Sequence, residues 1–322
     1  MLQTGPKTYI KRLNPTFASM VTLSDGIQEP LAPCPACGWE YWKKAGQVKD
    51  YSITGEWFEL LECPVCHLKT TYPHPKEAEI GRYYASEDYV SHSDTKAGLI
   101  NRIYHTARNY MLKKKFAWVK AASGLNTGTL LDVGAGTGHF AHYMQENGWK
   151  VTALEPDGKA RTIAAEKLHI NIQPLEELGR QKAQSFDVIT LWHVLEHVHD
   201  LSGYMDHFRS ILKPGGTLII AVPNHTSRDA RKYGAIWAAY DVPRHLWHFS
   251  PDAMKRLMTK HGFSLTNKIP MPLDAFYVSM LSEKYRGNDF MGSVAGFASG
   301  IGTFFSGRKN VDNASSVIYI AK

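Results

Sequence analysis

The stretch that decides the fold is Thr129–Gly138, "TLLDVGAGTG". Its first five residues predict a buried strand over 129–133. Three glycines at alternate positions follow, and the apolar-periodic run "HFAHYMQENG" after them predicts a helix that ends at Gly148. A strand, a glycine turn and a helix in this order predict the opening βα unit of a doubly wound α/β sheet.

The spacing of the glycines narrows the choice of cofactor. A dinucleotide fingerprint that begins at Gly134 would need a third glycine at position 139, where the sequence has His139. Further along, "KVTALEP" predicts a second strand that ends at Glu155, and "GKARTIAAEKL" predicts a second helix. A carboxylate at the tip of the second strand is placed to accept hydrogen bonds from a ribose diol.

The pattern Asp-x-Gly-x-Gly-x-Gly over 132–138 resembles the motif of class I S-adenosylmethionine (SAM) methyltransferases. "FDVITLWHVLEHV" resembles the fourth strand and following loop of that family, and "LKPGGTLIIAVPN" resembles its fifth strand. "HLWHFSPDAMKRLMTKHGFSL" resembles the helix before the sixth strand, and "SVIYIAK" the antiparallel last strand. The resemblance covers the last two thirds of the chain. It implies a Rossmann-like α/β fold with a seven-stranded sheet, and SAM as cofactor.

The same resemblance implies roles for individual residues. The glycine loop would admit the methionine end of SAM, Asp132 would support its amino group or the loop, and Glu155 would hold the ribose hydroxyls. The adenine would lie near the end of the third strand, around Pro174. The full set of expected cofactor-binding residues is Asp132, Gly134, Ala135, Gly136, Gly138, Glu155, Pro156, Leu175, Glu176, Trp192 and His193.

A cluster of histidines follows the fourth expected strand. His193-x-x-Glu196-His197 matches the H-x-x-E-H pattern of inverted zinc peptidases. That interpretation needs a longer amphipathic helix and a third metal ligand further along the chain. The run "FDVITL" instead predicts a buried strand that ends at the cofactor crevice. We therefore expect His193 beneath the sulfonium of SAM rather than on a metal-binding helix.

Catalytic candidates come from this cluster and from "AAYDVPRHLWHFS" (238–250), which follows the fifth strand. Methyl transfer from a sulfonium is an in-line displacement, so alignment of donor and acceptor matters most. A hydroxyl or acidic carbon acceptor also benefits from a base, and histidine has a suitable ordinary pKa. We expect His193 or His245 as the base, with Glu196 as an alternative or as the group that orients the base. For His197 and His248 we expect hydrogen bonds within the core.

The four cysteines form two C-x2-C pairs, Cys34/Cys37 and Cys63/Cys66, separated by residues 38–62. This spacing is typical of two knuckles that converge on one tetrahedral ion. Zinc is the expected ion, iron also suits four thiolates, and two disulfides are the alternative. With all four thiols on the metal, the site would be structural and no cysteine would remain as a nucleophile.

These motifs predict the domain organisation. We expect the following divisions: a tail over 1–30, a zinc ribbon over 31–75, a helical linker or cap over 76–124, and a SAM-binding methyltransferase domain over 125–322. No leader is recognisable, which favours a cytoplasmic location. The densest basic run, "LKKKFAWVK" (112–120), is expected to form a solvated helix face.

An apolar insertion, 290–307, precedes the last strand and contains no charged residue. It is too short and too rich in Gly, Ser and Thr for a spanning helix. Its glycine spacing favours close helix packing or a flexible lid. Flanking Arg286, Arg308 and Lys309 leave peripheral contact with a membrane or a lipid-linked acceptor as a minority hypothesis.

The substrate is the least determined part. The net charge is a modest +7, from 37 basic and 30 acidic residues. We expect O-, C- or N-methylation of a small-molecule, sugar or lipid-linked acceptor. The alternative is a methyltransferase for rRNA or tRNA that binds nucleic acid through its zinc module, although an Asn-Pro-Pro-Tyr motif and a free cysteine for pyrimidine chemistry are missing. A third possibility is a SAM-fold protein that acts only as a binding module.

Overall fold

A computed structural model describes residues 32–84, 99–288 and 290–322. The tail expected over 1–30 lies outside the described residues. The larger of two sheets has six strands in the order β5-β4-β6-β7-β10-β9. Their bounds are β4 (Thr129–Val133), β5 (Lys150–Leu154), β6 (Phe186–Trp192), β7 (Leu212–Pro223), β9 (Leu265–Pro270) and β10 (Ser316–Ala321). The first four in chain order pair in parallel, and β10 runs antiparallel to both of its neighbours. The expected antiparallel last strand is therefore present.

A seventh strand was expected beyond β5, but the described residues hold six in this sheet. At the position of the missing strand, Gln173 forms a single parallel bridge to Leu154. The backbone of Gln173 exchanges hydrogen bonds with Ala153 and Glu155 at 2.9 and 3.0 Å. Pro174 follows directly and has no N–H to continue the ladder, so pairing stops after one residue.

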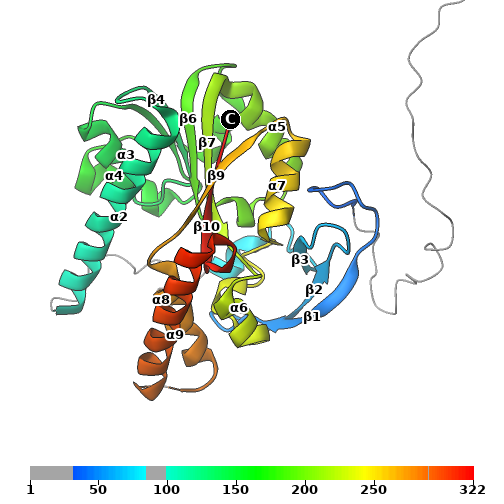
Figure 1. Cartoon of the computed structure of the whole chain (residues 1–322). Helices are drawn as coiled ribbons and strands as arrows, with labels where there is room; N and C mark the ends of the chain where they lie inside the picture. The colour runs from blue at the N-terminus through cyan, green and yellow to red at the C-terminus, as the bar shows by residue number, and fades with distance from the viewer. Residues whose placement is uncertain (1–31, 85–98, 289) are drawn as a thin grey trace, which may run out of the picture.

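Helices cover both faces of this sheet (Figure 1). On one side lie α2 (Leu99–Ser123), α3 (His139–Glu146) and α4 (Gly158–Leu168). On the other lie α5 (Leu201–Ile211) and α7 (Pro251–Lys260). The strand, glycine turn and helix predicted from "TLLDVGAGTG" are β4, the following loop and α3, so this prediction is confirmed.

The N-terminal module forms a second sheet with the order β1-β2-β3-β8. The strands β1 (Lys43–Lys49), β2 (Trp57–Glu62) and β3 (Lys69–Tyr72) come from the module itself. The fourth, β8 (Trp247–His248), comes from the segment after β7 and pairs with Lys69 and Thr70. The module therefore completes its sheet with a strand from the larger domain.

A helical hairpin protrudes from the C-terminal part of the molecule (Figure 1). It consists of α8 (Asp274–Tyr285) and α9 (Phe290–Lys309), next to the short α6 (Arg228–Tyr233). A Cβ added at Gly296 would lie 2.6 Å from the Cα of Met280, and one at Gly300 would lie 2.8 Å from the Cα of Phe276. The small residues of α9 thus allow backbone contact with α8. Of the helices that the structure describes, none combines the length and apolar character that a membrane crossing requires.

Candidate functional site

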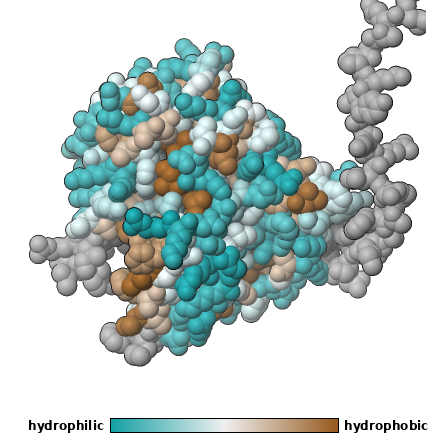
Figure 2. Space-filling model, in the orientation of Figure 1, coloured by the Kyte–Doolittle hydropathy of each residue, from teal (hydrophilic) through white to brown (hydrophobic). Residues whose placement is uncertain are grey.

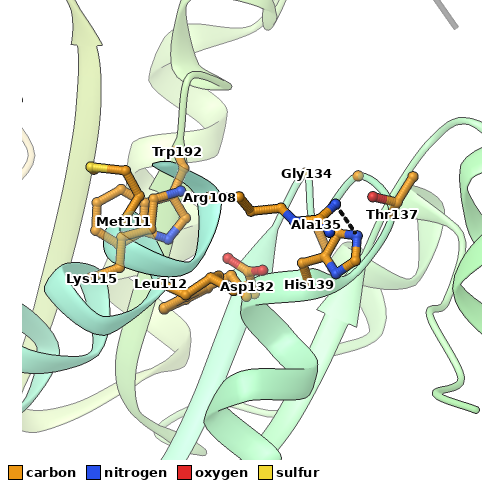
Figure 3. A pocket seen from close by; sticks show the side chains of 12 residues that line it. Arg108, Met111, Leu112, Lys115, Asp132, Gly134, Ala135, Thr137, His139 and Trp192 are labelled. Carbon is orange, nitrogen blue, oxygen red and sulfur yellow. Dashed lines mark hydrogen bonds between the residues drawn. The ribbon is translucent and has the colours of Figure 1, made fainter. Parts of the chain in front are cut away.

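A pocket of about 300 Å³ lies at the carboxyl ends of β4 and β6. The loop after β4 forms one wall, and the side of α2 that carries Arg108 and Lys115 forms another. Asp132, next to the last residue of β4, and Trp192, the last residue of β6, also line the pocket (Figure 3). Crevices at the carboxyl ends of parallel strands are the usual binding places of α/β folds.

Each glycine of the loop after β4 has a positive φ, and the three differ in what surrounds them. A Cβ on Gly134 would clash with Val194, and one on Gly138 would lie 2.5 Å from Ile170 Cδ1. Around Gly136 there is nothing within 4 Å of that position, although the residue lines the pocket. The outer two glycines are therefore required by packing, whereas the middle one leaves room for a ligand.

Glu155 supports this loop from the end of β5. Its Oε2 accepts a hydrogen bond from the N–H of Gly136 at 2.7 Å, and its Oε1 accepts one from the N–H of Asp157 at 3.0 Å. Burial raises the pKa of the carboxyl group, while these two backbone donors oppose the shift. The carboxylate thus fixes the glycine loop and keeps acceptor capacity beside the pocket.

A buried carboxyl group, Asp132, and a half-buried ammonium group, Lys115, both line the pocket. Asp132 is 1% exposed, and its Oδ1 accepts a hydrogen bond from the hydroxyl of Thr190 at 2.8 Å. Burial raises the pKa of Asp132 to about 7 and lowers the pKa of Lys115 to about 8. The Lys115 ammonium lies 4.4 Å from the centroid of the Trp192 ring, a cation–π contact. The pocket therefore combines an aromatic wall with a carboxylate that titrates near neutral pH.

The expected cofactor residues divide into two groups. Those that line the pocket are Asp132, Gly134, Ala135, Gly136 and Trp192. Those that do not line it are Gly138, Glu155, Pro156, Leu175, Glu176 and His193. Glu176 is exposed in the 3₁₀ turn η3 (Leu175–Arg180), and the Leu175 side chain packs partly against the main core. The adenine role of these two stays a prediction.

His193 follows β6 and has the left-handed φ of 58°. Its Nε2 lies 2.9 Å from Asp274 Oδ2 at the start of α8, and its Nδ1 lies 3.3 Å from Glu196 Oε1. Burial would lower the pKa of His193, but the Asp274 and Glu196 carboxylates outweigh it and raise the pKa to about 10. In this arrangement the ring is an imidazolium, which donates hydrogen bonds and cannot accept a proton.

The rings of His197 and His245 meet edge to face, with their centroids 4.6 Å apart. His197 Nδ1 lies 2.9 Å from the carbonyl oxygen of Arg244, and His245 Nδ1 lies 2.9 Å from that of Ala239. Beside them, Glu196 is completely buried in the 3₁₀ turn η4 (Leu195–His197). The structure thus brings together Glu196, His193 and His245, the three catalytic candidates from the sequence.

The peptidase interpretation of H-x-x-E-H is excluded by the backbone. His193 is in the left-handed region and η4 is a single short turn, so the two histidines do not share one face of an α-helix. His248 makes a buried contact instead, with its Nε2 3.0 Å from the Thr71 hydroxyl. The hydrogen bonds expected for His197 and His248 are present.

The four cysteines converge at one end of the N-terminal module, and all four are free thiols. The Sγ atoms of Cys34 and Cys66 lie 3.5 Å apart, as do those of Cys37 and Cys63. Each pair sits in a tight turn, in which the N–H of Gly38 and that of His67 bond back to the first cysteine's carbonyl oxygen. Sulfurs at this separation fit a tetrahedral ion with Zn–S bonds of about 2.3 Å. The disulfide alternative is not what the structure shows.

Comparison with known proteins identifies the larger domain. Residues 104–268, about half of the chain, match the family model described as "Methyltransferase domain". The chain belongs to this methyltransferase family. Over 124 residues it is 36% identical to the ubiquinone biosynthesis O-methyltransferase of Caulobacter vibrioides, which covers 36% of this chain and 49% of that protein. Over 164 residues it is 27% identical to the mitochondrial ubiquinone biosynthesis O-methyltransferase of Homo sapiens, which covers 46% and 44%.

The chain thus spans about half the length of the curated relatives it matches. Among solved structures, phosphoethanolamine N-methyltransferase 2 of Haemonchus contortus aligns with a TM-score of 0.49 and 15% identity. This alignment covers 87% of the present chain and 68% of that protein.

The pocket residues that were missed in the sequence include two basic side chains of α2, Arg108 and Lys115. Arg108 reaches from α2 toward the glycine loop, with Nη1 2.9 Å from His139 Nε2 (Figure 3). Lys115 belongs to the basic run that was expected to be a solvated face, but it points into the pocket while Lys113 and Lys114 are exposed. The sequence did contain a signal for this orientation. Lys115 lies three and four residues from the apolar residues of α2 that face the sheet, which places it on the same side of the helix.

Proposed function

We propose that the protein is a SAM-dependent methyltransferase that acts on a small-molecule acceptor. The observation that carries the proposal is the open space at Gly136, in a left-handed glycine loop at the carboxyl end of a parallel strand. The loop backbone approaches the pocket where no side chain intervenes, which suits a ligand that binds against backbone. Membership of the methyltransferase family supports the same cofactor.

The residues of the pocket fit the parts of SAM. Arg108 is the cation suited to the carboxylate of the methionine end, and Asp132 is the anion suited to its ammonium group. Glu155 keeps lone pairs for the ribose hydroxyls. SAM would supply an electrophilic methyl group on a sulfonium, and the protein's part is chiefly to align it with the acceptor.

We place the acceptor on the side of Glu196, His193 and His245. The relatives named ubiquinone biosynthesis O-methyltransferases support a hydroxyl oxygen as the methylated atom. His193, held as an imidazolium between Asp274 and Glu196, would place a positive charge beside this oxygen. Glu196 and His245, which lie close together, would receive or stabilise the hydroxyl proton.

We further propose a structural zinc ion on Cys34, Cys37, Cys63 and Cys66. Their sulfur spacing supports it, and a closed four-thiolate site leaves no open position for chemistry. The strand β3 of the module pairs with β8 of the methyltransferase domain, so this edge is used within the molecule. That pairing favours a role in supporting the acceptor side over the alternative of RNA binding.

Calorimetric titration with SAM tests the cofactor site. Gly136→Val fills the open space and strains a φ of 55°, and Glu155→Ala removes the loop's acceptor, so both variants should lose at least tenfold in affinity. Gly179→Ala, at an open surface position, is the matched control and should bind as the wild type does. Undiminished binding in both pocket variants would refute the site. Release of S-adenosylhomocysteine on addition of phenolic acceptors then tests turnover.

A further inference from the structure

The proposed base His245 belongs to a short segment, residues 244–248, that lies between two parts of the molecule. On one side, the N–H of Leu246 donates a hydrogen bond to the carbonyl oxygen of Glu196 at 2.8 Å. On the other side, the segment pairs through β8 with β3 of the N-terminal module. The place of His245 is therefore set by the module as well as by the turn that carries Glu196.

Two neighbouring threonines of β3 bind both carbonyl groups next to the base. The N–H of Thr71 donates to the carbonyl oxygen of Leu246 at 3.0 Å, and the Thr71 hydroxyl donates to that of His245 at 2.7 Å. The Thr70 hydroxyl also donates to the carbonyl oxygen of Leu246, at 3.0 Å. The backbone of the base is thus held by side chains of the module in addition to strand pairing.

Both threonine hydroxyls are buried, and each has a histidine as its second partner. Thr71 Oγ1 lies 3.0 Å from His248 Nε2, and Thr70 Oγ1 lies 2.6 Å from His74 Nε2. Because a carbonyl oxygen can only accept, the hydroxyl proton points to it and the hydroxyl oxygen accepts from the histidine. Burial lowers the pKa of both histidines, that of His74 to about 4, so both rings are neutral donors. The two hydroxyls therefore have fixed directions.

The presence of hydroxyls at these two positions is informative. Valine has nearly the same shape as threonine, suits a buried strand at least as well and needs no hydrogen-bond partner. A buried hydroxyl is costly unless its hydrogen bonds are made. The strand would close the module with valine at both positions, so what the threonines add is the contact with the carbonyl groups of His245 and Leu246.

The ring of His245 is oriented separately from its backbone. Its Nδ1 lies 2.9 Å from the carbonyl oxygen of Ala239, which fixes the tautomer and the direction of the ring. One ring nitrogen lies within 4.8 Å of a carboxylate oxygen of Glu196. Because Ala239 sets the ring and Thr71 sets the backbone, both are needed to hold the base beside this carboxylate.

We propose that Thr71, supported by Thr70, is a positioning residue for His245, so that the N-terminal module completes the acceptor side. The module then contributes to the reaction through the placement of the base rather than through a group that touches the substrate. The catalytic consequence rests on the proposed methyl transfer, whereas the positioning of His245 does not.

Nuclear magnetic resonance of the histidine rings tests the positioning without an acceptor. The full chain is produced with isotope-labelled histidine, and the ring signal of His245 is assigned by its absence in His245→Asn. Thr71→Val keeps the shape of the side chain and removes the hydroxyl, so the His245 signal should move by more than its line width. The bond from Thr71 reaches the carbonyl of His245 and not its ring, so this change would report a displaced residue.

Two further variants separate positioning from a general effect on the strand. Thr71→Ser restores the hydroxyl and should return the His245 signal to its wild-type position. Thr266→Val, the matched control, removes a strand hydroxyl that donates to a carbonyl oxygen of β10 at 3.0 Å, and should leave the signal unchanged. An unmoved signal in Thr71→Val, or one that Thr71→Ser does not restore, would overturn the proposal. If Thr71→Val does not fold, Thr70→Val replaces it with the same expected outcome.

Turnover provides the readout for catalysis. With an acceptor that the wild type methylates, Thr71→Val should lower kcat by about tenfold or more, because a displaced catalytic group is costly. The affinity for SAM should stay within about twofold, because Glu155, and not β3, holds the glycine loop. A wild-type kcat in Thr71→Val would overturn the proposal. A displaced His245 ring in a protein that methylates no acceptor would count against the proposed function alone.

Discussion

The proposed cofactor side, around the glycine loop, and the proposed acceptor side, around His193, Glu196 and His245, are built in different ways. On the cofactor side, the loop and its support are local: β4, the glycine loop and Glu155 lie within one stretch of chain, and Glu155 holds the loop through a backbone N–H. Only the opposite wall, from α2 and β6, comes from other segments. The acceptor side joins His193, Asp274 and His245 from three separate segments, and a buried ion pair links it to the N-terminal module. The geometry of the glycine loop therefore depends on backbone conformation. The geometry around His193 and His245 depends on charge pairs between residues far apart in the sequence.

The largest expected effect concerns the charge that ties the acceptor side to the module. Arg244 is fully buried and contacts Asp50 of the module and Asp241 at 2.8 Å each. Arg244→Ala would leave the buried Asp50 carboxylate and the partly exposed Asp241 carboxylate without their cation, and should lower the free energy of unfolding by about 3–5 kcal/mol. Urea denaturation measures this change.

Arg256→Ala is the matched control for this prediction. Arg256 pairs with Asp252 on the exposed face of α7, so its loss should change stability by no more than about 0.5 kcal/mol. If the two substitutions lower the free energy of unfolding equally, the buried ion pair between the module and the larger domain stabilises the protein no more than an exposed ion pair does.

The next effect concerns the cofactor side, where backbone conformation and packing can be separated. Gly134→Ala meets both a positive φ of 69° and a clash with Val194, and should cost about 1–3 kcal/mol. Gly136→Ala meets only the positive φ and should cost about 1 kcal/mol. Adding Val194→Ala should recover part of the first loss and none of the second. If Val194→Ala restores stability to the Gly136→Ala variant as well, the loss in Gly134→Ala does not come from a direct clash with Val194.

The same difference explains what the sequence could predict. The glycine loop and the paired cysteines follow from short patterns with a physical meaning, whereas the antiparallel last strand was implied by the resemblance to the methyltransferase family. Arg108 was missed because helical periodicity does not say what covers each face of α2. Asp274 belongs to no motif, and only the folded chain brings it to His193. At the position of the expected third strand, only Gln173 pairs with β5, because Pro174 has no N–H to continue the ladder.

A smaller effect follows from the pKa of about 7 at Asp132, which burial raises. A buried acid with a raised pKa stabilises the unliganded fold below its ordinary pKa near 3.9, and this contribution is lost as the pH rises through about 7. SAM is a cation, so it favours the ionised carboxylate. Its affinity should therefore rise by up to about tenfold per pH unit below pH 7 and level off above it.

Calorimetric titration between pH 5.5 and about 8.5 measures this slope. Asp132→Asn should remove most of it, and S-adenosylhomocysteine, which lacks the sulfonium charge, should show a shallower slope with the wild-type protein. A wild-type slope that persists in the variant would assign the titration to another group, with Lys115 and its pKa of about 8 the first candidate.

The smallest expected effect lies on α9, the helix that packs against α8. Val294, Phe297, Ile301 and Phe305 are exposed and follow one face of this helix, and Figure 2 shows apolar surface along the protruding hairpin. The helix has no acidic residue and ends in Arg308 and Lys309, which suits an anionic lipid surface. Membrane contact through 290–307 stays a prediction.

Phe297→Glu tests it with little risk to the fold, because a side chain that is 52% exposed should change stability by less than about 0.5 kcal/mol. Co-sedimentation with phosphatidylserine vesicles should fall several-fold. Tyr110→Glu, the same kind of change on exposed α2, should leave it unaltered. If both variants sediment as the wild type does, the exposed apolar face of α9 does not bind lipid. The hairpin would then contribute to the proposed acceptor side only through α8, whose Asp274 contacts His193.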